Sequence, residues 1–277
     1  MRSSVFWGLI IAAFAQSVHS SKSCPSLSGI ERFGPKPKAG PSNGQFLSCA
    51  SGFDGPKVQS VNETTYDWWY FDSINPNGNS SLAVVFFLEA PKSGFVSTSN
   101  LSSLDFVQIS GSFPNGTLFS EFILADDAII STQGDGANGN REGSGFSWSG
   151  APDLSRYVVS IDSVKTGING TFSLRSTAPP HYPCSPALPG QSLTVLPGVG
   201  WANGIPDADV TVNVQIGDTL IDFVGIGYHD KNWGVTPFTD SVGSWYWGHA
   251  RMGPYSIVWL DALDTSKNEY ASGYVAY

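Results

Sequence analysis

Short apolar or alternating segments follow one another along most of the chain, and clusters of turn residues separate them. The predicted strands are Ser81–Glu89, Phe106–Phe113, Thr117–Ala125, Gly145–Ser149, Tyr157–Ser163, Thr171–Thr177, Asp209–Ile216 and Thr219–Tyr228. Turn signals lie at 76–78, 114–116 and 134–139, and no segment has a convincing helical period. This spacing predicts an all-β chain, built as an antiparallel barrel or β-sandwich.

The segment 178–204 interrupts the pattern because it is rich in proline and glycine. We interpret it as a long connection inside a first domain that covers residues 21–238. A second β domain, 239–277, is expected to follow with the strands Trp245–Met252, Tyr255–Leu263 and Tyr270–Tyr277. Three strands cannot close a barrel and leave an apolar edge. The second domain is therefore expected to be incomplete and the chain truncated.

The first 20 residues have the features of a signal peptide, with Arg2 before the apolar stretch Val5–Ala15. This signal peptide predicts a secreted protein or one in the lumen of the secretory pathway. The five sequons agree with that route, at Asn62, Asn79, Asn100, Asn115 and Asn169. In an oxidising compartment the most plausible disulfide joins Cys24 to Cys49 and leaves Cys184 over, although spacing alone does not fix the pairing.

Composition narrows the classes of partner. The formal net charge of −9 argues against nucleic acid or an anionic membrane as a partner. After the signal, no apolar run reaches the length needed to span a membrane. No Cys-x-x-Cys or His-x-x-x-His spacing predicts a zinc site. With 13% aromatic and only 13% charged residues, the chain is typical of β proteins with apolar cavities.

Three segments combine aromatic rings with ionisable groups. Because side chains alternate along a strand, 66–72 places Trp68, Tyr70 and Asp72 on one face. By the same alternation, 245–251 places on one face Trp245, Trp247, His249 and Arg251. The third segment, Gly-Tyr-His-Asp-Lys-Asn-Trp at 227–233, contains turn residues. It is therefore expected at a strand end, with Lys231 solvated in the loop.

The motifs at 66–72 and 225–234, followed by an aromatic strand, resemble the family with two lipocalin-like domains that includes bacterial carotenoid 1,2-hydratases (hydroxyneurosporene synthases). The resemblance is greatest to its fungal branch, which contains Diels–Alderases of secondary metabolism, and it covers the chain from about residue 45 onward. It implies a lipocalin-like fold and a cofactor-free reaction. Asn232 occupies a place where some hydratase-like relatives carry an acid, and this departure favours cycloaddition over hydration.

The clusters themselves suggest how such a site would work. A carboxylic acid among rings loses hydration, which favours its protonated form, and ring faces stabilise a carbocation. The candidate catalytic residues are Asp72, His229, Asp230 and Asn232. The candidate substrate-binding residues are Trp68, Tyr70, Tyr228, Trp233, Trp245, Trp247, His249 and Arg251. For most of these, the competing interpretation is ordinary strand packing or, for His229 and Asp230, a structural hydrogen-bond network that closes the barrel mouth.

Four functions compete at this stage. The first is a pericyclase that performs a Diels–Alder or hetero-Diels–Alder reaction on an apolar polyene, quinone methide or terpenoid. The second is an acid-catalysed hydratase or dehydrating isomerase that acts on an isoprenoid through a carbocation. The third is a carrier of an apolar ligand. A carbohydrate-active protein ranks last because no pair of carboxylates has a compelling spacing. The oligomeric state stays open.

Overall fold

The computed structural model describes residues 29–90, 92–94 and 103–277. The predicted signal peptide, Cys24 and Asn100 lie outside the described residues. Cys49 is disulfide-bonded and Cys184 is an exposed free thiol, so the pairing of Cys49 with Cys24 stays a prediction. No helix in the described ranges is long and apolar enough to cross a membrane.

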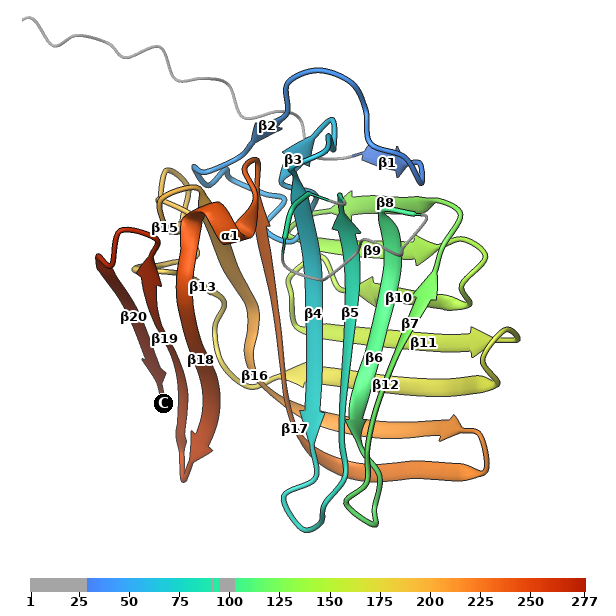
Figure 1. Ribbon diagram of the computed structural model, residues 1–277. Coiled ribbons are helices and arrows are strands. Elements are labelled where there is room, and N and C mark those ends of the chain that lie inside the picture. Colours follow the sequence, from blue (N-terminus) through green and yellow to red (C-terminus); the bar gives the residue numbers. More distant parts are fainter. Residues whose placement is uncertain (1–28, 91, 95–102) are drawn as a thin grey trace, which may run out of the picture.

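The described chain is almost entirely β-structure (Figure 1). The strands are β1 (Gly29–Phe33), β2 (Asn43–Gly44), β3 (Val58–Gln59), β4 (Tyr66–Ile74), β5 (Ser81–Glu89), β6 (Asp105–Ser112), β7 (Leu118–Leu124), β8 (Ala128–Gln133), β9 (Gly136–Arg141), β10 (Phe146–Gly150), β11 (Arg156–Ser163), β12 (Ile168–Ser176), β13 (His181–Tyr182), β14 (Ser185–Pro186), β15 (Thr194–Leu196), β16 (Val199–Ile216), β17 (Thr219–Gly234), β18 (Val242–Met252), β19 (Tyr255–Asp264) and β20 (Glu269–Ala276). A short helix, α1, spans Phe238–Ser241. The all-β prediction is confirmed.

One large antiparallel sheet forms a half-barrel, with the strand order β1-β8-β9-β10-β11-β12-β16-β17-β4-β5-β6-β7. Figure 1 shows two groups of strands in this sheet, β4–β7 and β8–β12, which run nearly at right angles to each other. The long strands β16 and β17 belong to both groups, because β16 pairs with β12 while β17 pairs with β4. They bend where the register shifts between Asn203 and Ala208, as β-bulges allow.

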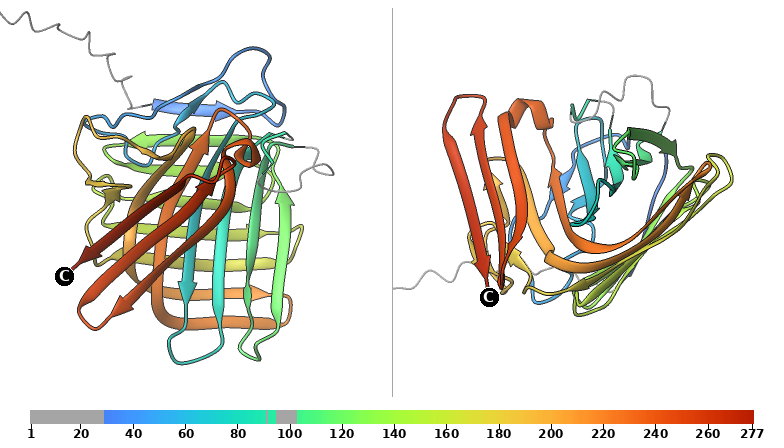
Figure 2. Two further views of the ribbon diagram at one scale, coloured as in Figure 1. Left: turned by 60° about the vertical axis from the view of Figure 1, so that its left-hand side comes forward. Right: turned by 90° about the horizontal axis from the view of Figure 1, so that it is seen from below.

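The bend brings the inner faces of the two strand groups together around the main apolar core. Aromatic side chains such as Trp69, Phe71, Trp148 and Phe172 fill this core and are almost completely buried. A second apolar cluster lies on the outer face of β4–β6 and includes Trp68, Phe87 and Phe238. It is covered by a separate three-stranded sheet, β18–β19–β20 (Figure 2). The outer face of the half-barrel is therefore an interface between two sheets.

Several predicted boundaries are wrong, and each error has a physical cause. The predicted strand at 209–216 begins at Val199 instead, so the expected connection 178–204 ends in a strand and also contains β13 to β15. Strand β9 was missed because its glycines and asparagines, 136–141, read as a turn. The Trp148 ring packs directly on the backbone of Gly139, where a Cβ would overlap it. The proposed domain boundary near 238 stays a prediction.

Candidate active site

The seven residues 227–233 do not lie in a loop at a strand end, as predicted, but within a strand. Their side chains therefore point to two different faces of the sheet. Strand β17 continues to Gly234, paired with β4 on one side and β16 on the other. The turn propensity of Asp-Lys-Asn is overridden because each of the three side chains has a buried partner. Alternation then divides the motif between two faces. Tyr228, Asp230 and Asn232 face the second sheet, whereas the three residues between and after them, His229, Lys231 and Trp233, face the half-barrel interior.

Lys231 is not a solvated loop residue but a fully buried one. Its Nζ lies 2.6 Å from an Asp67 oxygen and donates a second bond of 3.0 Å to the Gly55 carbonyl. The ammonium also lies 4.1 Å from the centre of the Trp69 ring. Burial lowers the pKa of Lys231 and raises that of Asp67, while the attraction between the two charges opposes both effects. The pair attaches the segment around Gly55 to the interior of the half-barrel.

His229 has a similar structural environment on the same face. Its ring stacks on Phe71 with centroids 4.1 Å apart, and Nε2 lies 3.1 Å from the Asp54 carboxylate. Asp54 also accepts the Tyr157 hydroxyl at 2.7 Å. Trp233 is likewise enclosed, and its indole N–H donates to the Gln45 carbonyl at 2.8 Å. These contacts form a structural hydrogen-bond network inside the half-barrel. They separate His229 and Trp233 from the other candidate residues.

Asp230 lies on the opposite face, within a buried polar cluster. One of its oxygens accepts the Trp201 indole N–H and the Tyr228 hydroxyl, both at 2.7 Å. The same hydroxyl contacts Asn203 Oδ1. Burial raises the pKa of Asp230 to about 6, although both donors oppose the rise. Because Tyr228 has one proton for two acceptors, a proton on Asp230 would let Tyr228 donate to Asn203 while it accepts from Asp230.

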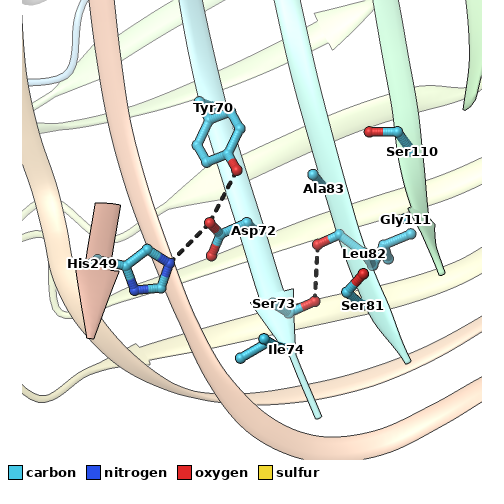
Figure 3. A pocket seen from close by; sticks show the side chains of 10 residues that line it. All are labelled: Tyr70, Asp72, Ser73, Ile74, Ser81, Leu82, Ala83, Ser110, Gly111 and His249. Carbon is cyan, nitrogen blue, oxygen red and sulfur yellow. Dashed lines mark hydrogen bonds and ion pairs between the residues drawn. The ribbon is translucent and has the colours of Figure 1, made fainter. Parts of the chain in front are cut away.

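A pocket of about 340 Å³ lies beside this cluster, on the outer face of β4, β5 and β6. Its lining residues are Tyr70, Asp72, Ser73, Ile74, Ser81, Leu82, Ala83, Ser110, Gly111 and His249 (Figure 3). Of the predicted site residues, Tyr70, Asp72 and His249 therefore share one pocket. The first two come from β4 of the half-barrel, and His249 comes from β18 of the second sheet.

Asp72 and His249 form the ionisable pair of the pocket. His249 Nε2 and the Tyr70 hydroxyl each lie 3.0 Å from Asp72 Oδ2 (Figure 3). Burial lowers the pKa of His249, but Asp72, together with the charges of Asp207 and Asp230, outweighs this effect and the net pKa is raised. The imidazole stacks on the Tyr228 ring at 4.9 Å, which fixes its orientation. Its other nitrogen, Nδ1, forms no hydrogen bond with another residue in the described part of the chain, so it can donate to a ligand.

The remaining aromatic candidates pack behind the pocket instead of lining it. Trp247 makes edge contacts with Tyr70 at 5.4 Å and lies 5.0 Å from Tyr228. Trp68 and Trp245 both contact Phe238 of α1. Asn232, a predicted catalytic residue, donates to the Gly200 carbonyl at 3.2 Å. The tryptophans thus pack between the second sheet and the half-barrel, whereas Asn232 bonds within the half-barrel sheet.

Arg251 shares the strand face of His249 but has a different role. Its guanidinium binds Asp207 with contacts of 2.8 to 3.1 Å and Asp209 at 2.8 Å. Asp207 is buried and also accepts the Ser256 hydroxyl at 2.5 Å. This ionic cluster attaches β18 and β19 to β16. The cost of burying the arginine is therefore met by structural partners, and Arg251 is not among the pocket residues.

Sequence reasoning missed the floor of the pocket. Ala83 pairs directly with Asp72 across the strands, and Ser110 pairs with Ala83. Both are small residues in apolar strands, so only the strand register could have identified them. Within the described ranges no group of three or more histidine, cysteine or acidic residues could hold a metal ion.

Comparison with known proteins gives the family. The profile of the family described as Diels-Alderase-like matches residues 35–274. The chain is 41% identical over 239 residues to the quinolone epoxide rearrangement protein asqO of Emericella nidulans, covering 85% of this chain and 65% of that protein. It is 38% identical over 231 residues to the quinolone epoxide rearrangement protein penF of Penicillium thymicola, covering 81% and 63%. The chain thus spans about two thirds of the length of these relatives.

The fold also has a counterpart among solved structures. The crystal structure of CghA with Sch210972 superposes with a TM-score of 0.74 at 20% identity, covering 89% of this chain and 67% of that one. At this identity the likeness concerns the fold alone. Because the family profile matches most of the described sequence, the chain belongs to the Diels-Alderase-like family.

Proposed function

We propose that the chain is a cofactor-independent isomerising enzyme of secondary metabolism that opens an epoxide in a small apolar substrate by acid assistance. The Asp72–His249 pair in the 340 Å³ pocket carries the proposal. An acid with a free N–H in a pocket is the group that such a reaction needs. The names of two relatives, both quinolone epoxide rearrangement proteins, support the reaction class.

The proposed reaction is an isomerisation in which all atoms are conserved. The His249 imidazolium gives the Nδ1 proton to the epoxide oxygen as one C–O bond breaks. The resulting cation accepts a neighbouring group that migrates with its bonding electrons, which forms a protonated carbonyl. That carbonyl returns its proton to the imidazole. Asp72 stabilises the imidazolium through Oδ2, and the Tyr70 ring, which also lines the pocket, stabilises positive charge on carbon.

A Diels–Alder or hetero-Diels–Alder reaction on a polyene, quinone methide or terpenoid is the second candidate. The match to the Diels-Alderase-like family favours it. In this reaction the pocket would hold the reacting ends close together. The His249 N–H would donate a hydrogen bond to a carbonyl of the substrate without transferring the proton. Both candidates use the same pocket and differ in whether a proton is transferred.

Two substitutions of His249 distinguish the candidates. Asparagine can place an N–H near the position of Nδ1 but is not an acid, whereas glutamine preserves a donor toward Asp72 near the position of Nε2. For epoxide opening, we expect both His249→Asn and His249→Gln to lower kcat by about 100- to 10,000-fold. For cycloaddition, His249→Asn should retain much more activity than His249→Gln. The measurement is kcat on a quinolone epoxide and on a carbonyl-activated polyene.

The pH dependence provides a second readout. Because the pKa of His249 is raised, the acid form persists above the ordinary histidine range, and kcat for epoxide opening should fall as pH rises through the raised value. Cycloaddition activated by a hydrogen bond should respond less steeply. Wild-type kcat in both His249 variants, with circular dichroism showing an intact fold, would exclude this pocket as the active site.

We also propose that the protein enters the secretory pathway. The apolar segment near the N-terminus and the sequons support this localisation. Three of the sequon asparagines, Asn79, Asn115 and Asn169, are exposed.

A further inference from the structure

The carboxylate of Asp72 has two oxygens in unequal environments. Oδ2 accepts from both Tyr70 and His249. Oδ1 is buried and has no hydrogen-bond partner among the described residues. A carboxylate oxygen carries two acceptor sites, and leaving it buried and unpaired is costly. The described side chains therefore leave one acceptor of this pocket-lining residue unsatisfied.

The nearest hydroxyl groups of the pocket cannot supply the donor. Ser73 gives its hydrogen to the Leu82 carbonyl at 3.2 Å. Ser81 is engaged with Ser112 at 2.9 Å. Ser110 lies two strands from Asp72 in the same cross-strand row, which is about 10 Å at the usual strand spacing. A donor to Oδ1 must therefore come from outside the protein side chains.

We propose that Asp72 Oδ1 accepts a hydrogen bond from a ring N–H of the substrate, and that the site takes a lactam or a similar flat heterocycle. The inference rests on the proposed function and names the substrate class of the same pocket. Ala83, the cross-strand neighbour of Asp72, leaves a shallow floor for a planar ring. The quinolone in the names of two relatives is a heterocycle of this kind.

One carboxylate would then position both partners of the reaction. Oδ2 holds the imidazole, and Oδ1 holds the substrate, so the reacting oxygen is placed at a fixed position relative to His249 Nδ1. The bond is charge-assisted and therefore stronger than one between neutral groups. Asp72 is thus a substrate-binding residue as well as the partner of the acid.

The test compares 2-quinolone with N-methyl-2-quinolone, which lacks the donor. Binding of each to the full chain is measured by calorimetry. For the wild type we expect the N–H probe to bind about 10- to 100-fold more tightly. In Asp72→Leu the ratio should fall to about one. Ser110→Ala, a control in the same pocket that leaves Oδ1 unchanged, should keep the wild-type ratio.

Equal affinities in the wild type would overturn the inference, as would a preference that survives in Asp72→Leu or the failure of either probe to bind. If Asp72→Leu does not fold, Asp72→Ser replaces it with the same expected loss. Failure of the proposed function is recognised separately, through the kcat values of the His249 variants. An N-methylated epoxide turned over with unchanged KM would refute the lactam contact and leave the acid role of His249 intact.

Discussion

Asp230 illustrates how a single residue can be close to a site without lining it. Its cluster with Trp201 and Tyr228 lies directly behind the Asp72–His249 pair, since Tyr228 stacks on the His249 ring. The negative charge of Asp230 also contributes to the raised pKa of His249. We therefore propose that Asp230 supports the orientation and charge of the proposed acid, His249.

The buried carboxyl group of Asp230 should make stability depend on pH. Its pKa is about 6 in the folded chain and 3.8 when unperturbed, so between these values the folded state binds more protons than the unfolded state. Stability from this group is present below about pH 4 and is lost as pH rises to about 6. Two pKa units correspond to about 3 kcal/mol.

Replacing Asp230 by asparagine should remove this dependence. We expect the free energy of unfolding of the wild type minus that of Asp230→Asn to fall by about 3 kcal/mol between pH 4 and pH 7. Urea unfolding at both pH values gives the difference, and using a difference cancels the other titrating groups. A difference that does not change with pH would mean that the group titrates equally in both states.

Alternation predicted residue faces well where the strand was recognised. Tyr70 and Asp72 lie on one face, as do Trp247 and His249, and all four meet between the sheets. It failed for 227–233 because local turn propensity concealed the strand. The buried partners that override this propensity, such as Asp67 and Trp201, are far away in sequence.

At the scale of elements, β16 and β17 determine the shape of the molecule. Their central bend joins the two strand groups, and β16 passes so close to β17 that side-chain size is restricted. A Cβ on Gly200 would lie 2.1 Å from the Trp233 ring, which is fully buried. Glycine is required there because the indole occupies the space above the backbone.

Gly200→Ala should therefore destabilise the fold. Displacing the Trp233 ring and its bond to Gln45 should lower the free energy of unfolding by about 1 to 3 kcal/mol or more. Gly273→Ala is the matched control, since that strand glycine has open space at the Cβ position. The control should leave stability unchanged or raise it by up to about 1 kcal/mol. Equal effects of both substitutions in urea unfolding would contradict the packing argument.

Element prediction succeeded where apolar residues dominate and failed where they do not. The strand at Ser81–Glu89 was predicted with its observed boundaries because its apolar run is continuous. Strand β9 and the first half of β16 were missed because glycine, asparagine and proline are abundant there. Pairing with neighbouring strands stabilises these segments, and this pairing cannot be predicted from their local sequence.

The whole molecule places two exposed sequons at the same end of the half-barrel as the pocket. Asn79 and Asn115 lie in the turns after β4 and β6, which carry Asp72 and Ser110 respectively. Asn62 differs because its side chain is already bonded to Gly40, Thr64 and Thr65. Asn79 and Asn115 are therefore more accessible to glycosylation than Asn62.

Expression through a fungal secretory pathway should give glycans at Asn79, Asn115 and Asn169 and little at Asn62. Enzymatic deglycosylation followed by peptide mass spectrometry reads each site, because release of the glycan converts asparagine to aspartate. Asn169, far from the pocket along the sheet order, serves as the internal control for access. An unmodified, efficiently secreted chain, or a chain retained in the cytosol, would contradict the proposed route.

The floor of the pocket and its imidazole come from separate sheets. Substitutions on β5 and β6 can reshape the floor without touching His249, and changes on β18 can alter reactivity without moving the floor. Substrate specificity and reactivity can thus evolve independently. Changes on β18 could therefore alter the reaction while the same substrate is still bound, and changes on β5 or β6 could alter the substrate while the reaction stays the same.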